Sequence, residues 1–125
     1  MQNLINWKGK NMTPEALWER YSAIWSAREA PRTAELAACL ADEATYCDPN
    51  GLVEGREALS AYMGGFQESA PGCRFRIKSV LDHNGRTLAN WSMVGPDGAV
   101  LQDGTSFALL AGDGRLQTIT GFFYG

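Results

Sequence analysis

The stretch from residue 73 to residue 124 reads CRFRIKSVLDHNGRTLANWSMVGPDGAVLQDGTSFALLAGDGRLQTITGFFY, and its pattern decides the fold. Apolar and polar residues alternate along it, which is typical of strands with one buried face. Three glycine-containing turns divide it: Asn84-Gly85, Pro96-Asp97-Gly98 and Asp113-Gly114. Such pairs favour hairpin turns, so the stretch predicts an antiparallel meander. Its four strands are expected at about residues 74–82, 87–94, 100–110 and 116–123.

The part of the chain before residue 73 has helical spacing instead. Thr13-Pro14-Glu15 is a good helix start, because a hydroxyl cap, a proline and a carboxylate all suit the first turn. We expect this helix to reach about Arg28 and to end before Pro31. A second, shorter helix is predicted from Thr33, and a third from Arg56 to about Glu68.

One short strand is predicted between the second and third helices. It covers Ala44 to Asp48, after a turn at Asp42-Glu43, and stops where Pro49-Asn50-Gly51 turns the chain. Helices gathered at the start and strands at the end predict an α+β fold, with three N-terminal helices packed on a curved antiparallel sheet. The 125 residues suffice for one domain, at 13–125, preceded by an N-terminal extension at 1–12.

The composition narrows the classes of partner. The net charge of −3 argues against nucleic-acid binding, and no stretch is apolar enough for a membrane span. The start of the chain lacks the apolar run of a signal peptide. The three cysteines form no CxxC pair, which fits a reducing compartment. We therefore expect a cytoplasmic protein.

Strand parity predicts which side chains point toward the helices. Ala89, Trp91 and Met93 form one face of their strand, and Ile119, Gly121 and Phe123 one face of the last strand. An aromatic and thioether lining around the small Gly121 suits a flat apolar ligand. Ordinary core packing is the alternative interpretation of the same residues.

Two polar side chains are candidates for chemistry in that space. Asp48 ends a strand with Tyr46 on its own face, and a carboxylate directed into an apolar cavity is a better proton acceptor and donor than a solvated one. Tyr21 lies on the buried stripe of the first helix, so its hydroxyl needs a partner or a ligand. The alternatives are an Asx turn at Asp48 and a core tyrosine bonded to backbone.

The chain resembles the nuclear transport factor 2-like superfamily, also called the SnoaL-like group, and within it the bacterial ketosteroid isomerases. The resemblance spans Thr13 to Tyr124. It is carried by these segments: Arg20-Tyr21, Asp42-Glu43-Ala44-Thr45, Asp48-Pro49 with Gly51, Gly55-Arg56-Glu57, His83-Asn84-Gly85 and Gly114-Arg115-Leu116-Gln117-Thr118. It implies a cone-shaped, cystatin-like fold.

The resemblance also implies roles for single residues. Tyr21 matches the tyrosine that binds the dienolate oxygen in the isomerases, and Asp48 matches the aspartate that shuttles the proton. Ser106 stands where those enzymes carry a protonated aspartic acid, so it is the third candidate catalytic residue. Asp103 is an alternative acid, which would reach the pocket only through a bulge near Gly104.

Further positions follow from the same comparison. Six residues match substrate-binding positions: Ala89, Trp91, Met93, Ile119, Phe123 and Met63. Met63 and Leu40 stand where the isomerases have tyrosines that support the hydrogen-bond network.

Two functions compete at this point. The first is intramolecular proton transfer on an enolisable hydrophobic ketone, with Asp48 as base and Tyr21 as oxyanion donor, and with neither metal nor organic cofactor. The alternative is a non-catalytic module of the same fold that binds a small hydrophobic molecule or serves in dimerisation. In either case we expect a homodimer formed through the sheet.

Overall fold

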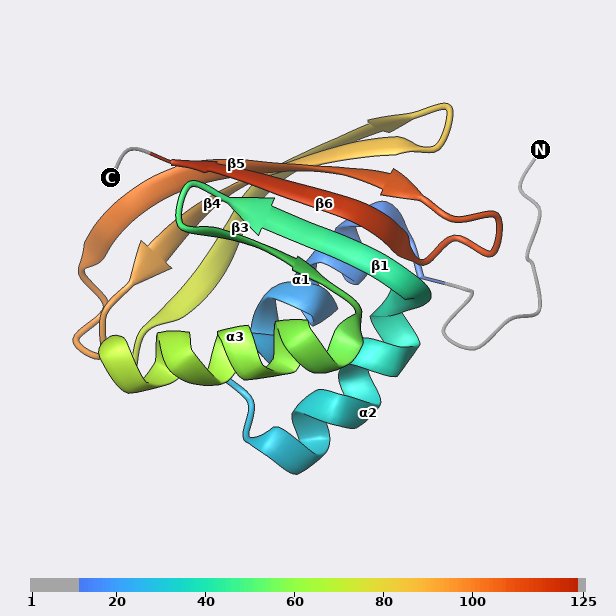
Figure 1. Ribbon diagram of the computed structural model, residues 1–125. Coiled ribbons are helices and arrows are strands. Elements are labelled where there is room, and N and C mark those ends of the chain that lie inside the picture. Colours follow the sequence, from blue (N-terminus) through green and yellow to red (C-terminus); the bar gives the residue numbers. More distant parts are fainter. Residues whose placement is uncertain (1–11, 124–125) are drawn as a thin grey trace.

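The computed structural model describes residues 12–123, in which three helices pack against one face of a six-stranded sheet (Figure 1). The elements are α1 (Pro14–Ile24), α2 (Glu29–Cys39), β1 (Leu40–Asp48), β2 (Gly51–Glu54), α3 (Arg56–Ser69), β3 (Arg74–His83), β4 (Arg86–Val94), β5 (Val100–Leu110) and β6 (Leu116–Phe123). The α+β class predicted from the sequence is confirmed. Except for Met12, the predicted N-terminal extension at 1–12 lies outside the described residues.

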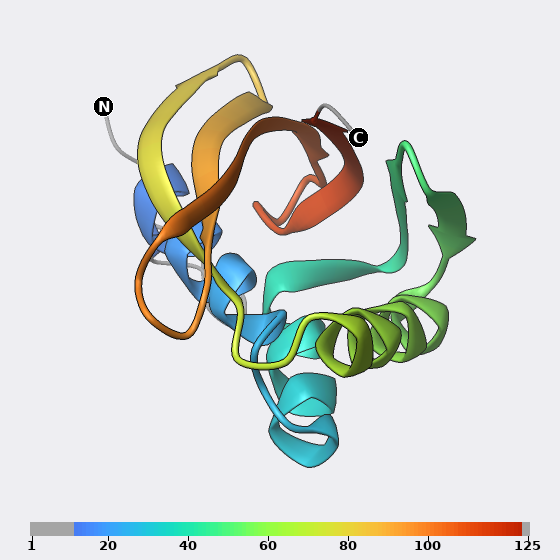
Figure 2. The same ribbon diagram turned by 90° about the vertical axis from the view of Figure 1, so that its left-hand side faces the viewer.

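The strand order is β2-β1-β6-β5-β4-β3, so the predicted meander β3 to β6 forms one continuous side of the sheet. Its strands pair antiparallel, with bounds within one residue of those expected. β1 instead runs parallel to β6, which makes the sheet mixed rather than wholly antiparallel. The strands curl around the helices, with β3 on one side and the β1–β2 hairpin on the other (Figure 2).

The boundary between the first two helices differs from the prediction. α1 ends at Ile24, and Pro31 lies inside the first turn of α2 instead of terminating α1. A first-turn residue has no helical acceptor for its N–H, so a proline costs nothing there. The side chain of Gln67 on α3 donates to the carbonyls of Trp25 and Ala27, at 2.7 and 2.9 Å, and so ties the α1–α2 link to α3.

The strand before α3 is also longer than predicted. No turn forms at Asp42-Glu43: both residues belong to β1, whose register against β6 shifts between Leu40 and Thr45. The turn at Pro49 and Asn50 reverses the chain into β2, a short strand that the sequence pattern did not predict. Four residues are too few for alternation to be recognised.

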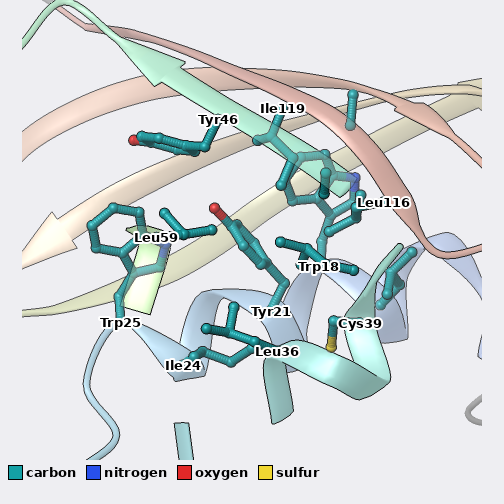
Figure 3. Close-up of a cluster of buried hydrophobic side chains, with 14 of the residues drawn as sticks. Trp18, Tyr21, Ile24, Trp25, Leu36, Cys39, Tyr46, Leu59, Leu116 and Ile119 are labelled. Atoms are coloured by element: carbon teal, nitrogen blue, oxygen red, sulfur yellow. The ribbon is translucent and has the colours of Figure 1, made fainter. Parts of the chain in front are cut away.

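Large apolar side chains from all three helices and from β1 and β6 fill the core at one end of the sheet (Figure 3). Trp18 is almost wholly buried, and its indole Nε1 donates to Thr87 Oγ1 at 2.9 Å, which joins α1 to β4. No helix among residues 12–123 is long and apolar enough to cross a membrane.

Gly104 is a position where close packing requires glycine. The indole of Trp91, its partner across the β4–β5 pair, lies directly over the Gly104 backbone, so that a Cβ there would overlap the ring. The ring is itself held by a hydrogen bond from its indole N–H to Ser106 Oγ.

We therefore predict that Gly104→Ala lowers the free energy of unfolding by about 1–3 kcal/mol, as overpacking usually does. Urea denaturation followed by tryptophan fluorescence measures the loss. Gly112→Ala is the matched control, because a Cβ at Gly112 meets nothing within 4 Å. Equal unfolding midpoints for the two variants would contradict the prediction.

Candidate active site

A cavity of about 570 Å³ opens between the helices and the concave face of the sheet. Its volume is in the range of small-molecule sites. Its lining is mostly aromatic and aliphatic: Trp18, Tyr21, Trp25, Tyr46, Ala61, Tyr62, Phe66, Phe75, Ile77, Trp91, Met93 and Phe123. The polar or small residues of the lining are Ser22, Asp48, Asn50, Gly65, Ser69, Gln102 and Ser106.

The aromatic rings of the lining contact one another and form a continuous wall. Trp25 is central to it, with four rings at centroid distances between 5.4 and 6.2 Å: Tyr46, Tyr62, Phe66 and Phe75. Trp91 extends the wall from Phe75 to Phe123. Tilted and edge-to-face pairs of this kind each contribute roughly 0.5–1.5 kcal/mol beyond their buried area. The cavity wall is therefore a packed structure before any ligand enters.

Asp48 is placed at the cavity by the end of β1, and its carboxylate accepts three hydrogen bonds. The hydroxyl of Tyr46 donates to Oδ2 at 2.6 Å, and the hydroxyl of Tyr62 donates to Oδ1 at 2.8 Å. The backbone N–H of Asn50 also donates to Oδ1 at 2.8 Å. The two interpretations of Asp48 thus coexist, since it lines the cavity and also makes the Asx bond of the following turn.

Tyr21 lines the same cavity from α1. Its side chain is 4% exposed, and its hydroxyl is the one buried side-chain polar atom of the described residues that has no hydrogen-bond partner. The hydroxyl points away from α1, in the direction of β1 and Tyr46 (Figure 3). Burial raises the pKa of Tyr21 well above its usual range, an effect that Trp25 partly opposes. The group is a protonated, unused donor at neutral pH.

The two phenols that donate to Asp48 are also protonated at neutral pH. Burial, then the hydrogen bond to Asp48, raises the pKa of Tyr62 to about 12. Burial chiefly raises the pKa of Tyr46, with further contributions from the nearby Tyr21 and from Asp48. Asp48 is consequently surrounded by neutral donors.

Ser106 and Asp48 both lie beside Gly121. A Cβ built on Gly121 would lie 3.5 Å from Ser106 Oγ, 3.6 Å from Asp48 Cβ and 3.7 Å from the Tyr46 hydroxyl. Ser106 Oγ accepts a hydrogen bond from the Trp91 indole at 3.0 Å, which leaves its own hydrogen to donate. The three candidate catalytic residues from the sequence, Asp48, Tyr21 and Ser106, therefore line one cavity.

The predicted substrate-binding residues divide into two groups. Trp91, Met93 and Phe123 line the cavity as expected. Ala89, Ile119 and Met63 do not: each is at most 1% exposed and belongs to the packed core. Ala89 and Ile119 do point inward from the sheet, and Met63 inward from α3, but at these positions the inward direction leads into the packed core and not into the cavity.

Asp103 lies outside the cavity. The β4–β5 register is continuous through Gly104, so no bulge turns Asp103 inward. On the opposite face of β5 its carboxylate contacts Lys78 Nζ at 3.1 Å. The Ser92 hydroxyl, followed by the Lys78 ammonium, lowers the pKa of Asp103. The strict alternation of a regular strand excludes it from the site.

Tyr62 and the Trp25 wall are site features that the sequence interpretation missed. The signal for Tyr62 was present, since it precedes Phe66 by one helical turn and so shares its face. Asp48 is the sole charged side chain in the described lining. No group of three His, Cys, Asp or Glu side chains suited to a metal ion occurs among residues 12–123.

Comparison with solved structures agrees with this architecture. A structure from Agrobacterium tumefaciens, described as a "putative isomerase of the SnoaL-like family", is 26% identical with a TM-score of 0.84, over 91% of this chain and 100% of that one. A "putative SnoaL-like polyketide cyclase" from Jannaschia sp. is 15% identical with a TM-score of 0.73, over 98% and 91%. A "putative ketosteroid isomerase" from Kribbella flavida is 16% identical with a TM-score of 0.63, over 90% and 78%.

Other matching structures are described as nuclear transport factor 2-like or as having a cystatin-like fold, which confirms the expected fold. No curated protein matches the chain. The family model of the SnoaL-like domain matches residues 18–119, which include all the elements from α2 to β5, most of α1 and half of β6. The chain belongs to the SnoaL-like family.

Proposed function

We propose that this protein catalyses intramolecular proton transfer on a small, enolisable hydrophobic ketone, without a cofactor. One observation carries the proposal: a carboxylate, Asp48, and a buried phenol without a partner, Tyr21, line the same aromatic cavity. A base and an unused hydrogen-bond donor that line one apolar cavity are the two groups that such a reaction needs.

In the proposed reaction Asp48 is the base. Its carboxylate removes a proton from the carbon next to the ketone, and the electron pair of the C–H bond passes to the carbonyl oxygen, forming an enolate. The resulting carboxylic acid returns the proton to another carbon of the conjugated system, and the carbonyl is restored. Atoms and charge balance without an external acid, because one group carries the proton in both steps.

Tyr21 is the proposed donor to the enolate oxygen, with Ser106 as a second donor. Burial keeps the pKa of Tyr21 high, so the phenol retains its proton while the oxygen beside it becomes negative. A donor that is already held at the cavity wall needs no reorganisation during the reaction. The names of two structural relatives, "putative isomerase" and "putative ketosteroid isomerase", agree with this chemistry.

A specific observation favours a second candidate, a non-catalytic module that binds a small hydrophobic molecule. Three donors already occupy acceptor positions of the Asp48 carboxylate, which leaves fewer for a substrate, and a serine stands where a second acid is expected. The aromatic wall by itself is sufficient for binding.

The two candidates are separated by UV-monitored isomerisation of a β,γ-unsaturated ketosteroid. We expect turnover by the native protein and a loss of at least about 100-fold in Asp48→Asn, because an amide cannot accept the proton. Asp103→Asn is the matched control: it removes the same charge from the outer face of the sheet and leaves the rate unchanged.

Binding is followed in parallel by quenching of tryptophan fluorescence, since Trp25 and Trp91 line the cavity. Equal rates in the native protein and Asp48→Asn would eliminate Asp48 as the base. Binding without conversion in the native protein would establish the second candidate.

Tyr21→Phe tests the oxyanion donor separately from folding. The change removes a buried hydroxyl that has no partner, so we expect the free energy of unfolding to stay the same or to rise. The turnover number should fall by roughly 100- to 1,000-fold, as for other lost oxyanion donors. Chemical denaturation and steady-state rates measure the two effects. An unchanged rate would remove Tyr21 from the mechanism.

We also propose that the protein is a homodimer formed through the outer face of the sheet. Leu81, Leu109 and Phe122 expose 67%, 36% and 61% of their surfaces, and strand parity directs all three outward. Sedimentation equilibrium is expected to give twice the chain mass, and Phe122→Ser to shift the protein toward monomer. A monomeric native protein at micromolar concentration would refute this arrangement.

A further inference from the structure

We propose that Tyr62 is a positioning residue that determines which oxygen of Asp48 accepts the proton, and that Gly51 is the residue that makes room for it. The inference rests on the proposed role of Asp48 as the base. It concerns the hydrogen bonds around that carboxylate and is therefore also testable without turnover.

The two oxygens of Asp48 are not equivalent. Each oxygen of a carboxylate has about two lone-pair directions in which it accepts hydrogen bonds. Oδ1 uses both, for the Tyr62 hydroxyl and the Asn50 N–H, each at 2.8 Å. Oδ2 uses one, for the Tyr46 hydroxyl at 2.6 Å. The open acceptor direction of the carboxylate is therefore on Oδ2.

Of the three donors, Tyr62 is the one supplied by a separate element. Asn50 and Tyr46 lie two residues from Asp48 and belong to the same hairpin, whereas Tyr62 reaches it from α3. Without the Tyr62 bond, Oδ1 would have a free acceptor direction of its own. The carboxylate could then present either oxygen to a ligand, and α3 would lose its hydrogen bond to the base.

Gly51 allows Tyr62 to occupy this position. Gly51 is the cross-strand partner of Asp48 in the β1–β2 hairpin, and the ring of Tyr62 lies against its backbone. A Cβ on Gly51 would lie 3.1 Å from Tyr62 Cε1 and 3.2 Å from the Tyr62 hydroxyl. Such contacts are tight, so the end of the tyrosine would have to shift by a few tenths of an ångström, which disturbs its hydrogen bond to Asp48.

The other titratable groups around Asp48 are phenols. Tyr46 faces it from β1, Tyr62 from α3 and Tyr21 from α1, and all three have a raised pKa because of burial. β5 and β6 contribute the uncharged Ser106 and Gly121. These phenols therefore keep their protons at neutral pH and add no charge beside the carboxylate.

Tyr62→Phe removes a donor to the ionised carboxylate and leaves the ring in place. Because the lost bond favoured the charged form, the proton should bind at a higher pH, by about one pH unit for a charge-assisted bond. Two readouts should move together: the carboxyl carbon-13 resonance of Asp48 and the acid limb of the rate profile. Gly51→Ala should cause a smaller shift in the same direction, although it alters neither tyrosine nor aspartate.

The experiment compares the native protein, Tyr62→Phe, Gly51→Ala and the control Gly112→Ala by carbon-13 NMR titration of aspartate-labelled protein. Asp48→Asn identifies the resonance, and thermal melts verify that each variant is folded. A resonance that titrates at the same pH in the native protein and Tyr62→Phe would overturn the proposal. So would a shift in Gly112→Ala as large as that in Gly51→Ala.

The outcomes also separate this inference from the proposed function. A shifted resonance in a protein without turnover would refute the isomerase and leave the positioning role of Tyr62 established for a binding site. Turnover that depends on Asp48, with an unshifted resonance in Tyr62→Phe, would support the isomerase and refute the positioning role of Tyr62.

Discussion

The hydrogen bonds that converge on the Asp48 carboxylate are the interaction on which the site depends. They join the end of β1, the turn that follows it and the middle of α3 at one point beside the cavity. A charged group next to aromatic rings is costly unless donors compensate it, and two phenols and one backbone N–H do so. One of those phenols, Tyr62, packs against the β1–β2 hairpin at Gly51, where there is no side chain.

The site contains one group whose presence lowers stability. The Tyr21 hydroxyl is buried without a partner, which costs about 1–3 kcal/mol of folding free energy relative to a bonded hydroxyl. The surrounding structure offsets this cost: the Trp18–Thr87 hydrogen bond and the ring contacts of Trp25 with Tyr46 and Phe75 hold this part of the chain against the sheet. In the proposed function this unsatisfied donor serves a ligand, so that stability is exchanged for activity.

The sequence interpretation was accurate for features that depend on neighbouring residues and wrong for features that depend on residues far apart in the chain. Strands β3 to β6 were predicted within one residue because alternation and the glycine turns are local signals. The predicted end of α1 was wrong because the α1–α2 link is held by Gln67, which lies 42 and 40 residues beyond its two acceptors, Trp25 and Ala27. The β2 strand was missed because it exists only as the partner of β1. Strand parity predicted which side chains of β4 and β6 point inward, but it could not distinguish those that line the cavity from those that pack in the core.

The sequence by itself determined the α+β class, the meander, the inward parity of Trp91 and Phe123, and the residue types available for chemistry, Asp48 and Tyr21 among them. These follow from periodicity and turn geometry, which act between near neighbours. The tertiary structure alone decided that β1 runs parallel to β6, that Ala89, Ile119 and Met63 are covered, and that Tyr62 donates to Asp48. Each of these depends on how distant segments pack, and no local pattern specifies which inward side chain meets a neighbour and which meets open space.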